Sequence, residues 1–414
     1  MEQKSSQSRT SSRNFNKSSY RGRKRSGNNS WKYRGKRNYG GSQRFRGAKI
    51  NPERYIAKAV QSEQSNLHVT DIEFGDFGLA EALNLNIEKK RYVHPTQIQD
   101  QTIPHILAGK DVLGLASTGS GKTAAFLIPM VNKAILDKNE RCLIIVPTRE
   151  LADQIQKELE QLTNGTRIKS VLVIGGASMH RQIYLLKNRP QFVIGTPGRM
   201  KDLNERRMLN LSHFRNVILD EVDRMLDMGF IHDIRALISK MNAEKQSLFF
   251  SATMSLKAEE VARTFLNDPI KIQTEKQSPK KNVDQNIVKF KNPEEKLDIL
   301  HDLLINEDFK KVLIFSRTKR GADKLSKKLV QRGFKADAIH GDKTQNRRLR
   351  IISNFRQDSI NVLIATDVAS RGLDISNITH VINYDEPATY DDYIHRIGRT
   401  GRVGKKGVAL TFVS

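Results

Sequence analysis

The sequence of 414 residues contains one cysteine, Cys142, and no apolar run of the length that crosses a membrane. A single cysteine excludes an internal disulfide and a cysteine-rich zinc site, and its place in the apolar segment RCLIIVP favours a role in core packing. No apolar stretch follows Met1, so neither a secretory signal nor a membrane span is expected. We therefore expect an intracellular protein and assign it to the cytoplasm.

Acidic residues are scarce relative to basic ones, and the imbalance is concentrated at the N-terminus. The chain has 71 Lys and Arg against 45 Asp and Glu, a net charge of +26, and residues 1–50 hold fifteen of the basic residues but only one acid, Glu2. This segment is rich in Ser, Gly and Asn, and its six aromatic residues follow no helical or strand period. Because such a segment buries too little apolar surface to offset its ordering entropy, we predict a disordered basic tail over residues 1–70.

Within the tail, Arg, aromatic and Gly residues are interleaved, as in YRGRKRSG and WKYRGKRNYGG. Phosphate contacts by Arg and base stacking by the aromatic rings would suit loose binding to single-stranded nucleic acid. Two other interpretations stay open, namely a solubilising segment and a localisation signal in RGRKR.

After residue 70, short β-branched runs alternate with helical stretches. Continuous apolar strands separated by helices predict parallel sheets covered on both faces, and the chain length suits two domains. The expected strands cover residues 111–116, 142–147, 170–176, 192–197, 216–220 and 247–253, and then 311–316, 335–341, 361–367, 380–385 and 408–413. We predict an α/β fold with a first domain over residues 71–275, a linker over 276–286 and a second domain over 287–414. Ligands are expected at the carboxyl ends of the strands.

The segment ASTGSGKT, residues 116–123, lies between an expected strand and an expected helix, as a phosphate-binding loop requires. Gly119 and Gly121 would let backbone amides point at phosphate oxygens, and the helix N-terminus favours the same anion. The loop residues expected to contact the nucleotide are Ser117, Thr118, Gly119, Ser120, Gly121, Lys122 and Thr123. Lys122 can reach the outer phosphates, and Thr123 can ligate Mg²⁺. The generic loop has a glycine where this chain has Ala116, so the spacing alone does not settle the assignment.

The segment DEVDRMLDMGF, residues 220–230, crowds three carboxylates into four positions after the apolar run FRNVIL. Like charges this close repel, and desolvating them is costly unless a cation is near. A strand-ending Asp near Mg²⁺ is the usual partner of a phosphate-binding loop. We therefore expect Asp220 to hold the metal, largely through water, and Glu221 to orient and deprotonate the attacking water. An acidic helix N-terminus would explain one or two of the acids, but not their pairing with the loop.

These motifs together resemble those of the DEAD-box ATP-dependent RNA helicases of helicase superfamily 2. The resemblance implies two tandem RecA-like domains, ATP and Mg²⁺ as cofactors, and single-stranded or short duplex RNA as the partner. In RYVHPTQIQ it implies that Gln99 hydrogen-bonds the adenine edge and that Phe74 stacks on the ring. Asp374 would touch the ribose or the outer phosphates, and Arg399 and Arg402 of HRIGRTGR would act as arginine fingers.

The resemblance also assigns residues to RNA binding and to coupling. Segments similar to the RNA-binding motifs contain Pro147, Thr148, Arg149, Gly175, Gly176, Thr196, Gly198, Arg199, Arg317, Gly341, Arg348 and Thr366. Residues expected to couple hydrolysis to strand separation are Asp223, Ser251, Thr253, His395 and Arg396. Thr, Gly and Arg near strand ends can contact phosphates and 2′-hydroxyls without reading bases, so sequence-independent binding is expected.

Three features depart from the family pattern. Arg91 stands where the family usually has Gly, which leaves the local turn uncertain, and Val222 replaces the Ala of DEAD while keeping all three acids. The sequence ends at Ser414, directly after the last expected strand, so no C-terminal specificity domain is expected.

The sequence predicts an RNA-dependent ATPase that couples ATP binding and hydrolysis to local unwinding of RNA or remodelling of ribonucleoproteins, with a monomeric core. A DNA helicase or translocase with the same two-domain core stays open. So does a passive RNA-binding scaffold, although the intact set of Lys122, Asp220, Glu221, Arg399 and Arg402 speaks against an inactive core. ATPase assays with RNA, with DNA and without nucleic acid would separate the three.

Overall fold

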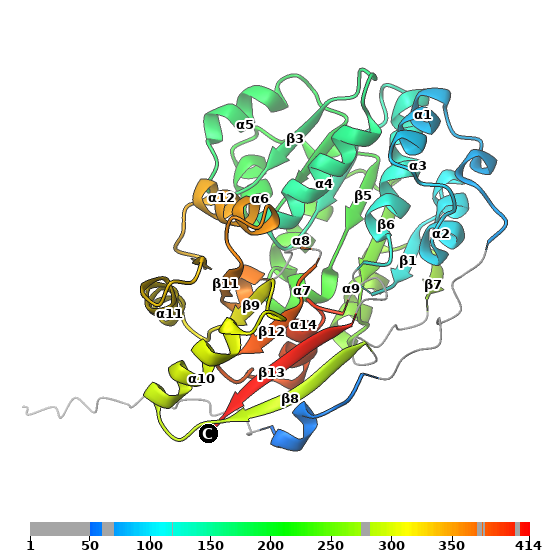
Figure 1. Ribbon diagram of the computed structural model, residues 1–414. Helices are drawn as coiled ribbons and strands as arrows, with labels where there is room; N and C mark the ends of the chain where they lie inside the picture. The colour runs from blue at the N-terminus through cyan, green and yellow to red at the C-terminus, as the bar shows by residue number, and fades with distance from the viewer. Residues whose placement is uncertain are drawn as a thin grey trace, which may run out of the picture. The chain divides into compact units, whose positions relative to one another are not determined.

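The computed structural model describes residues 50–59, 70–117, 119–274, 282–370, 375, 377–401 and 406–414. It contains a seven-stranded and a six-stranded parallel sheet, each with helices on both faces (Figure 1). We call the two units built on these sheets the first and the second domain, and the predicted α/β fold of two parallel-sheet domains is confirmed. The predictions for Thr118, Asp374, Arg402 and the tail up to residue 49 lie outside the described residues.

The first domain has the strand order β3-β4-β2-β5-β6-β1-β7, and all its pairs are parallel. Its strands are β1 (Val112–Leu115), β2 (Cys142–Ile145), β3 (Ser170–Val173), β4 (Phe192–Gly195), β5 (Asn216–Leu219), β6 (Gln246–Ser251) and β7 (Ile270–Gln273). The central strands are buried along their whole length, which explains why they are apolar at consecutive positions.

Helices of the first domain pack on the two faces of its sheet in two groups. One core contains residues of α1 (Glu81–Lys89), α2 (Gln97–Leu107), α3 (Lys122–Leu136) and α4 (Arg149–Leu162), next to η2 (Phe74–Phe77). The opposite core contains residues of α5 (Met179–Leu186), α6 (Pro197–Glu205), η3 (Leu211–His213), α7 (Val222–Asp227), α8 (Ile231–Ile238) and α9 (Leu256–Phe265). Val222 is fully buried in this second core, so the side chain that departs from DEAD contributes to apolar packing.

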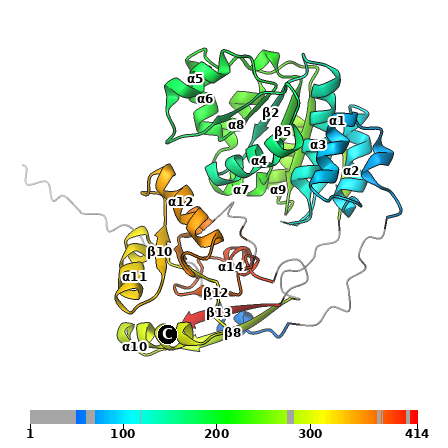
Figure 2. The ribbon, with the colours of Figure 1, turned by 45° about the horizontal axis from the view of Figure 1, so that its top comes forward.

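The second domain has the strand order β10-β11-β9-β12-β13-β8. Its elements are β8 (Val283–Lys289), α10 (Pro293–Ile305), β9 (Val312–Phe315), α11 (Lys319–Gln331), β10 (Ala336–Ile339), α12 (Gln345–Arg356), β11 (Val362–Ala365), α13 (Asp367–Ser370), β12 (His380–Asn383), α14 (Tyr390–Ile397) and β13 (Gly407–Val413). Residues of α10 and α11 pack on one face of the sheet, and those of α12, α13 and α14 on the other. Figure 2 shows the same sheet from a second direction.

Two boundaries differ from the sequence-based expectation. The second sheet begins at Val283, inside the expected linker, because β8 is an edge strand of mixed polarity and lacks the apolar run used to find the other strands. Residues 50–59, expected in the disordered tail, contain the short helix η1 (Pro52–Tyr55), and Tyr55 is fully buried. Strand β7 was also missed, since only one of its four residues is buried.

Arg91 occupies a left-handed turn directly after α1. Its φ is +58°, its N–H donates to the carbonyl of Glu88, and the N–H of Tyr92 donates to the carbonyl of Ile87. These two bonds form a Schellman motif, whose left-handed position is usually glycine. Here an arginine adopts the left-handed conformation that glycine would adopt more easily.

Two further expectations concern the single cysteine and the distribution of charge. Cys142 is buried in β2, and burial raises the pKa of its thiol, which agrees with a packing role. No helix among the described residues is long and apolar enough to cross a membrane.

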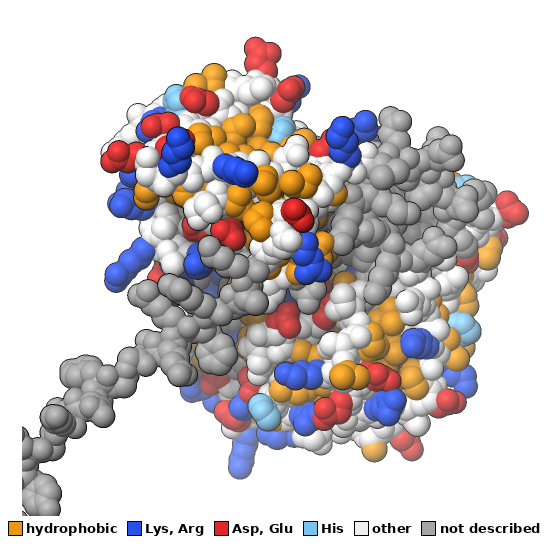
Figure 3. All heavy atoms as spheres, turned by 90° about the horizontal axis from the view of Figure 1, so that it is seen from below, with side chains coloured by type: hydrophobic (Ala, Val, Ile, Leu, Met, Phe, Trp, Pro, Cys, Tyr) orange, Lys and Arg blue, Asp and Glu red, His pale blue; other side chains and the backbone are white. Residues whose placement is uncertain are grey.

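On the face shown in Figure 3, Lys and Arg side chains are interspersed with Asp and Glu. This mixture contrasts with residues 1–50, where basic residues outnumber acidic ones by fifteen to one.

Candidate active site

The strand order of the first domain brings DEVD, SAT and the phosphate-binding loop together. Strands β5, β6 and β1 are neighbours, and DEVD, SAT and the phosphate-binding loop follow their carboxyl ends. Because carboxyl ends of parallel strands share one edge of a sheet, three motifs that are far apart in the sequence lie side by side.

The phosphate-binding loop runs from β1 into α3 and is shaped by two glycines. Gly119 and Gly121 have φ values of +88° and +95°. The Lys122 ammonium group donates to the carbonyls of Ala116 and Ser117, at 2.6 and 2.9 Å. Burial lowers the pKa of Lys122, while Asp220, Glu221 and Asp223 oppose this shift. The cation therefore lies within the loop and near the crowded acids, as the sequence suggested.

The N-terminus of α2 is hydrogen-bonded directly to the phosphate-binding loop. Gln99 accepts a hydrogen bond from the Thr96 N–H at 2.9 Å and donates to the carbonyl of Gly121 at 3.0 Å, while the Thr96 hydroxyl donates to the carbonyl of Ser120 at 2.8 Å. A side chain at position 121 would clash with Gln99 and Thr96. The amide oxygen and nitrogen of Gln99 can each make one more hydrogen bond, as contact with an adenine edge would require.

Phe74 belongs to an aromatic group beside this segment. It is buried, its ring stacks on that of Tyr92 with centroids 6.0 Å apart, and Phe77 meets it edge-on at 6.1 Å. The hydroxyl of Tyr92 donates to Glu158 at 3.0 Å. Tyr92 therefore holds the ring of Phe74 in place, a role that sequence reasoning missed. The aromatic position next to Arg91 was the signal in the sequence that could have indicated it.

Asp220 is a buried carboxylate at the end of β5. Burial raises its pKa, the nearby Lys122 lowers it, and its side chain accepts a hydrogen bond from the Glu221 N–H at 2.9 Å. Among the described residues, no group of three or more His, Cys, Asp or Glu is placed to hold a metal ion. A magnesium ion bound mainly through water and phosphates needs only one or two protein oxygens, and Asp220 with Thr123 fits that requirement.

Glu221 is held by a residue that sequence reasoning missed. Its backbone is left-handed, with φ of +55°, and its carboxylate accepts from Arg224 at 2.6 Å. Both side chains are largely buried, at 12% and 5% exposure. The spacing of three residues on one helical turn could have indicated the pair. Arg224 fixes the direction of the carboxylate expected to act on water.

Asp223 joins DEVD to SAT. Its carboxylate accepts from the Thr253 N–H at 3.0 Å and from the Thr253 hydroxyl at 2.9 Å, and its own N–H donates to the Ser251 hydroxyl at 3.3 Å. The Ser251 hydroxyl donates in turn to the carbonyl of Thr253 at 2.8 Å. The three residues expected to take part in coupling therefore form one hydrogen-bonded group within the first domain.

The residues expected to bind RNA in the first domain follow the other three neighbouring strands, β3, β4 and β2. Pro147, Thr148 and Arg149 come after β2, Gly175 and Gly176 after β3, and Thr196, Gly198 and Arg199 after β4. The Arg149 guanidinium lies against Gly175 and Gly176, where any side chain on either glycine would clash with it. Arg199 donates to the carbonyl of Ala177 and to Gln182, both at 3.3 Å. The three segments therefore adjoin one another.

A similar grouping occurs in the second domain, where β10, β11 and β9 are neighbours. Gly341 follows β10, Thr366 follows β11 and Arg317 follows β9, while Arg348 lies on α12. The Arg317 N–H donates to Asp385 at 2.8 Å.

The Arg396 side chain makes hydrogen bonds within the second domain. It is buried, and its guanidinium donates to both carboxylate oxygens of Asp367 at 2.6 and 2.8 Å, to Asn383 at 3.2 Å and to the carbonyl of Asp385 at 2.7 Å. These bonds fix α14 to the ends of β11 and β12. Any contribution of Arg396 to coupling must therefore act through the position of α14. His395 lies next to it on the helix, and Arg399, two residues beyond the helix end, is also buried.

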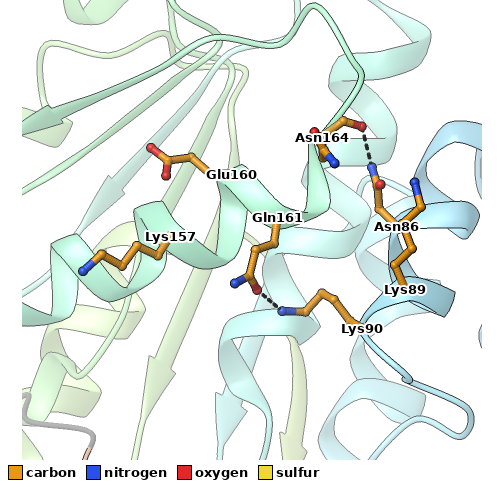
Figure 4. Close-up of a pocket in the computed structure, with 7 residues that line it drawn as sticks. All are labelled: Asn86, Lys89, Lys90, Lys157, Glu160, Gln161 and Asn164. Atoms are coloured by element: carbon orange, nitrogen blue, oxygen red, sulfur yellow. Dashed lines mark hydrogen bonds between the residues drawn. The ribbon is translucent and has the colours of Figure 1, made fainter. Parts of the chain in front are cut away.

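A surface pocket of about 690 Å³ lies between α1 and α4 (Figure 4). It is lined by Asn86, Lys89, Lys90, Lys157, Glu160, Gln161 and Asn164. Of these, Lys157, Glu160 and Gln161 lie in the C-terminal half of α4, whereas Arg149 begins that helix, so the pocket is separate from the motifs.

Comparison with known families identifies the family to which these motifs belong. Residues 96–261 match the DEAD/DEAH box helicase family, and residues 295–404 match the helicase conserved C-terminal domain. The chain is also 45% identical over 345 residues to the ATP-dependent RNA helicase CshA of Limosilactobacillus reuteri, covering 83% of this chain and 69% of that protein. The chain belongs to the DEAD-box helicases.

Further similarities agree with this assignment. DEAD-box ATP-dependent RNA helicase CshA of Geobacillus kaustophilus is 44% identical over 344 residues, covering 82% of this chain and 73% of that protein. Dbp5 of S. cerevisiae bound to RNA and ADP BeF3 is 32% identical, with a TM-score of 0.73, covering 82% of this chain and 89% of that one. Mss116 bound to ssRNA and UDP-BeF is 28% identical, with a TM-score of 0.74, covering 83% of this DEAD-box chain and 76% of that one.

Proposed function

We propose that this DEAD-box chain is an ATP-dependent RNA helicase that grips the RNA backbone without reading sequence and couples ATP hydrolysis to local unwinding or ribonucleoprotein remodelling. One observation carries the proposal. In the first sheet, β5 and β1 lead to the nucleotide motifs, β6 between them leads to the coupling motif, and this group adjoins the three strands that lead to the motifs expected to bind the RNA backbone, β3-β4-β2. A single edge of one sheet thus serves both ligands, with β2 and β5 paired at the boundary.

The residues of the site divide the reaction between them. Lys122 leaves its loop carbonyls to bind the outer phosphates, Gln99 and Phe74 hold the adenine, and Glu221, aligned by Arg224, takes a proton from the attacking water. Magnesium, held by Asp220 and Thr123 largely through water, would neutralise charge on the phosphates. Arg399 and Arg402, from the second domain, stabilise charge that develops on the transferred phosphoryl group.

This division of labour makes hydrolysis depend on RNA. The fingers belong to a different domain from Lys122, so turnover requires that RNA bring the two domains together. The bonds from Asp223 to Thr253 link the acids that act on the nucleotide to the segment after β6. Through these bonds, hydrolysis can change how the first domain binds RNA. The core acts as a monomer, and ribonucleoproteins are its expected targets.

Steady-state ATPase assays with RNA, with DNA and without nucleic acid test the proposal. We expect low turnover alone, strong stimulation by unrelated RNA sequences and weak stimulation by DNA. Arg399→Ala should remove the stimulation, by about 10³–10⁵-fold, while nucleotide affinity stays within a few-fold. Equal stimulation by DNA would favour a DNA translocase, and no turnover under any condition would favour a passive RNA-binding scaffold.

A further inference from the structure

A short segment that precedes the first domain in the sequence is built into the second domain. Residues 50–59 lie beside β8 in both ribbon views (Figures 1 and 2). Ala57 and Gln285 exchange two backbone hydrogen bonds, at 3.0 and 2.7 Å, and the Ala59 N–H donates to the Asp284 carboxylate at 2.7 Å. The segment therefore covers the edge of β8, the last strand of the sheet.

The same segment packs on α14. Tyr55 is fully buried, its ring centroid lies 4.7 Å from that of Tyr393, and the Arg54 guanidinium lies 4.4 Å from the ring centroid of Tyr390. Tyr55 and Tyr393 share a core with Val283, Ile397, Ala409 and Val413. The Tyr393 hydroxyl donates to Gln285 at 2.9 Å, so helix, strand and segment are joined by one buried contact set.

The helix held in this way leads to Arg399. Ile397, the last residue of α14, belongs to the Tyr55 core, and the Arg399 N–H donates to the carbonyl of Arg396 at 3.1 Å. Arg396 attaches the helix to Asp367 through its guanidinium, while Tyr55 packs on it through Tyr393. Residues 398–401, which follow α14 and include Arg399, are therefore held by two supports, one of which comes from outside the two matched helicase segments.

We propose that Tyr55, with the segment of residues 50–59, is a positioning residue for Arg399. Tyr55 touches neither nucleotide nor RNA in this role. Its ring packs against Tyr393 of α14, so that the helix holds Arg399 in a fixed position relative to the sheet. The inference rests on the proposed role of Arg399. It predicts that loss of the Tyr55 ring lowers turnover, because a catalytic group displaced by about 1 Å can cost on the order of 10²-fold in rate.

The chain offers matched variants for a test. Tyr55→Ala removes the ring, and Tyr55→Phe keeps it while deleting a hydroxyl that is buried and has no hydrogen-bond partner among the described residues. Leu329→Ala opens a smaller cavity in the same domain, in the core formed with α10 and α11 on the opposite face of the sheet. All three are made in the full chain and assayed below their own melting temperatures.

We expect Tyr55→Ala to lower kcat at saturating RNA and ATP by about 10–10²-fold, with the Kd for a fluorescent ATP analogue unchanged within about twofold. Tyr55→Phe should restore turnover, and Leu329→Ala should retain it. A Tyr55→Ala chain that keeps its kcat would overturn the inference, as would a Leu329→Ala chain that loses as much. If Arg399→Ala itself keeps RNA-stimulated turnover, the proposed finger role fails first.

Hydrogen exchange on the unaltered chain gives an outcome that does not depend on whether Tyr55→Ala folds. The amides of Ala57 and Gln285 bond to each other's carbonyls, so both should be protected in the absence of ligands. Rapid exchange of both amides would show that the segment is not held on β8 and would refute the inference.

Discussion

Replacing Arg91 by glycine should stabilise the first domain. Arg91 has φ of +58° in the Schellman turn after α1, and its side chain is exposed. The left-handed conformation costs an L-residue about 1–2 kcal/mol, whereas glycine adopts it without that penalty. Glycine loses about 0.5–1 kcal/mol more backbone entropy on folding. The net gain from Arg91→Gly is therefore about 0.5–1 kcal/mol.

Scanning calorimetry of the intact chain can measure this gain. The transition of the first domain is identified as the one that ATP raises, since a ligand bound only to the folded state stabilises it. A gain of this size should raise that transition by about 1–4 °C in a domain of this length. Arg91→Ala, which keeps the φ requirement and removes the guanidinium, should change it by less than about 1 °C.

Two results would refute this reasoning. If Arg91→Ala gained as much as Arg91→Gly, the arginine side chain and not its backbone would be the destabilising feature. If Arg91→Gly melted lower, the guanidinium would be making a contact worth more than the strain of the turn. In either case, the affinity for ATP should stay unchanged, because the hydrogen bonds of Gln99 to Thr96 and Gly121 do not involve Arg91.

Three other predictions concern catalysis, the tail and pH. Glu221→Gln should lower turnover by about 10²–10⁴-fold while ATP and RNA stay bound, and RNA release as fast as in the unaltered chain would contradict the clamp-and-release mechanism. Removal of residues 1–49, which carry all of the tail's excess positive charge, should flatten the slope of log RNA affinity against log salt by roughly three units if about five phosphates are engaged. It should leave turnover at saturating RNA unchanged, and an unaltered slope would favour a solubilising tail. Burial lowers the pKa of His380 to about 4, against a weaker opposing effect of Asp308, so below pH 6.5 the unfolded chain takes up a proton that the folded chain does not. The free energy of unfolding should therefore be highest above pH 6.5 and fall by about 1 kcal/mol toward pH 5, after allowance for solvent screening. In thermal unfolding, His380→Phe should lose that part of the pH dependence.

Much of the fold follows from local patterns. Strands buried on both faces are apolar at consecutive positions, so β2, β5 and β9 stand out as the runs CLII, NVIL and VLIF. The phosphate-binding loop is equally local, since its glycines and Lys122 must be adjacent to form the turn. The edge strands β7 and β8 were not predicted because both are only partly buried and therefore lack a continuous apolar run.

The composition of the active site was less visible. The crowded acids of DEVD indicated that a cation lies nearby, but the role of each acid depends on its hydrogen-bond partners. Arg224 fixes Glu221, and Thr253 binds Asp223, although the latter two lie thirty positions apart. Sequence patterns list candidate residues, and the order of strands decides which of them meet.

The amino-acid sequence by itself determined the elements that depend on neighbours along the chain, namely the buried strands, the phosphate-binding loop and the basic composition of the tail. Only the tertiary structure decided that Arg396 is used within the second domain and that residues 50–59 belong to that domain. Tyr55 is the single aromatic residue of residues 50–59, a stretch in which no helical or strand period marks it. Its neighbour Ala59 bonds to Asp284, 225 positions away. Such contacts arise because the edge of β8 offers unpaired backbone groups and α14 offers an apolar surface, and both exist only after the sheet has formed.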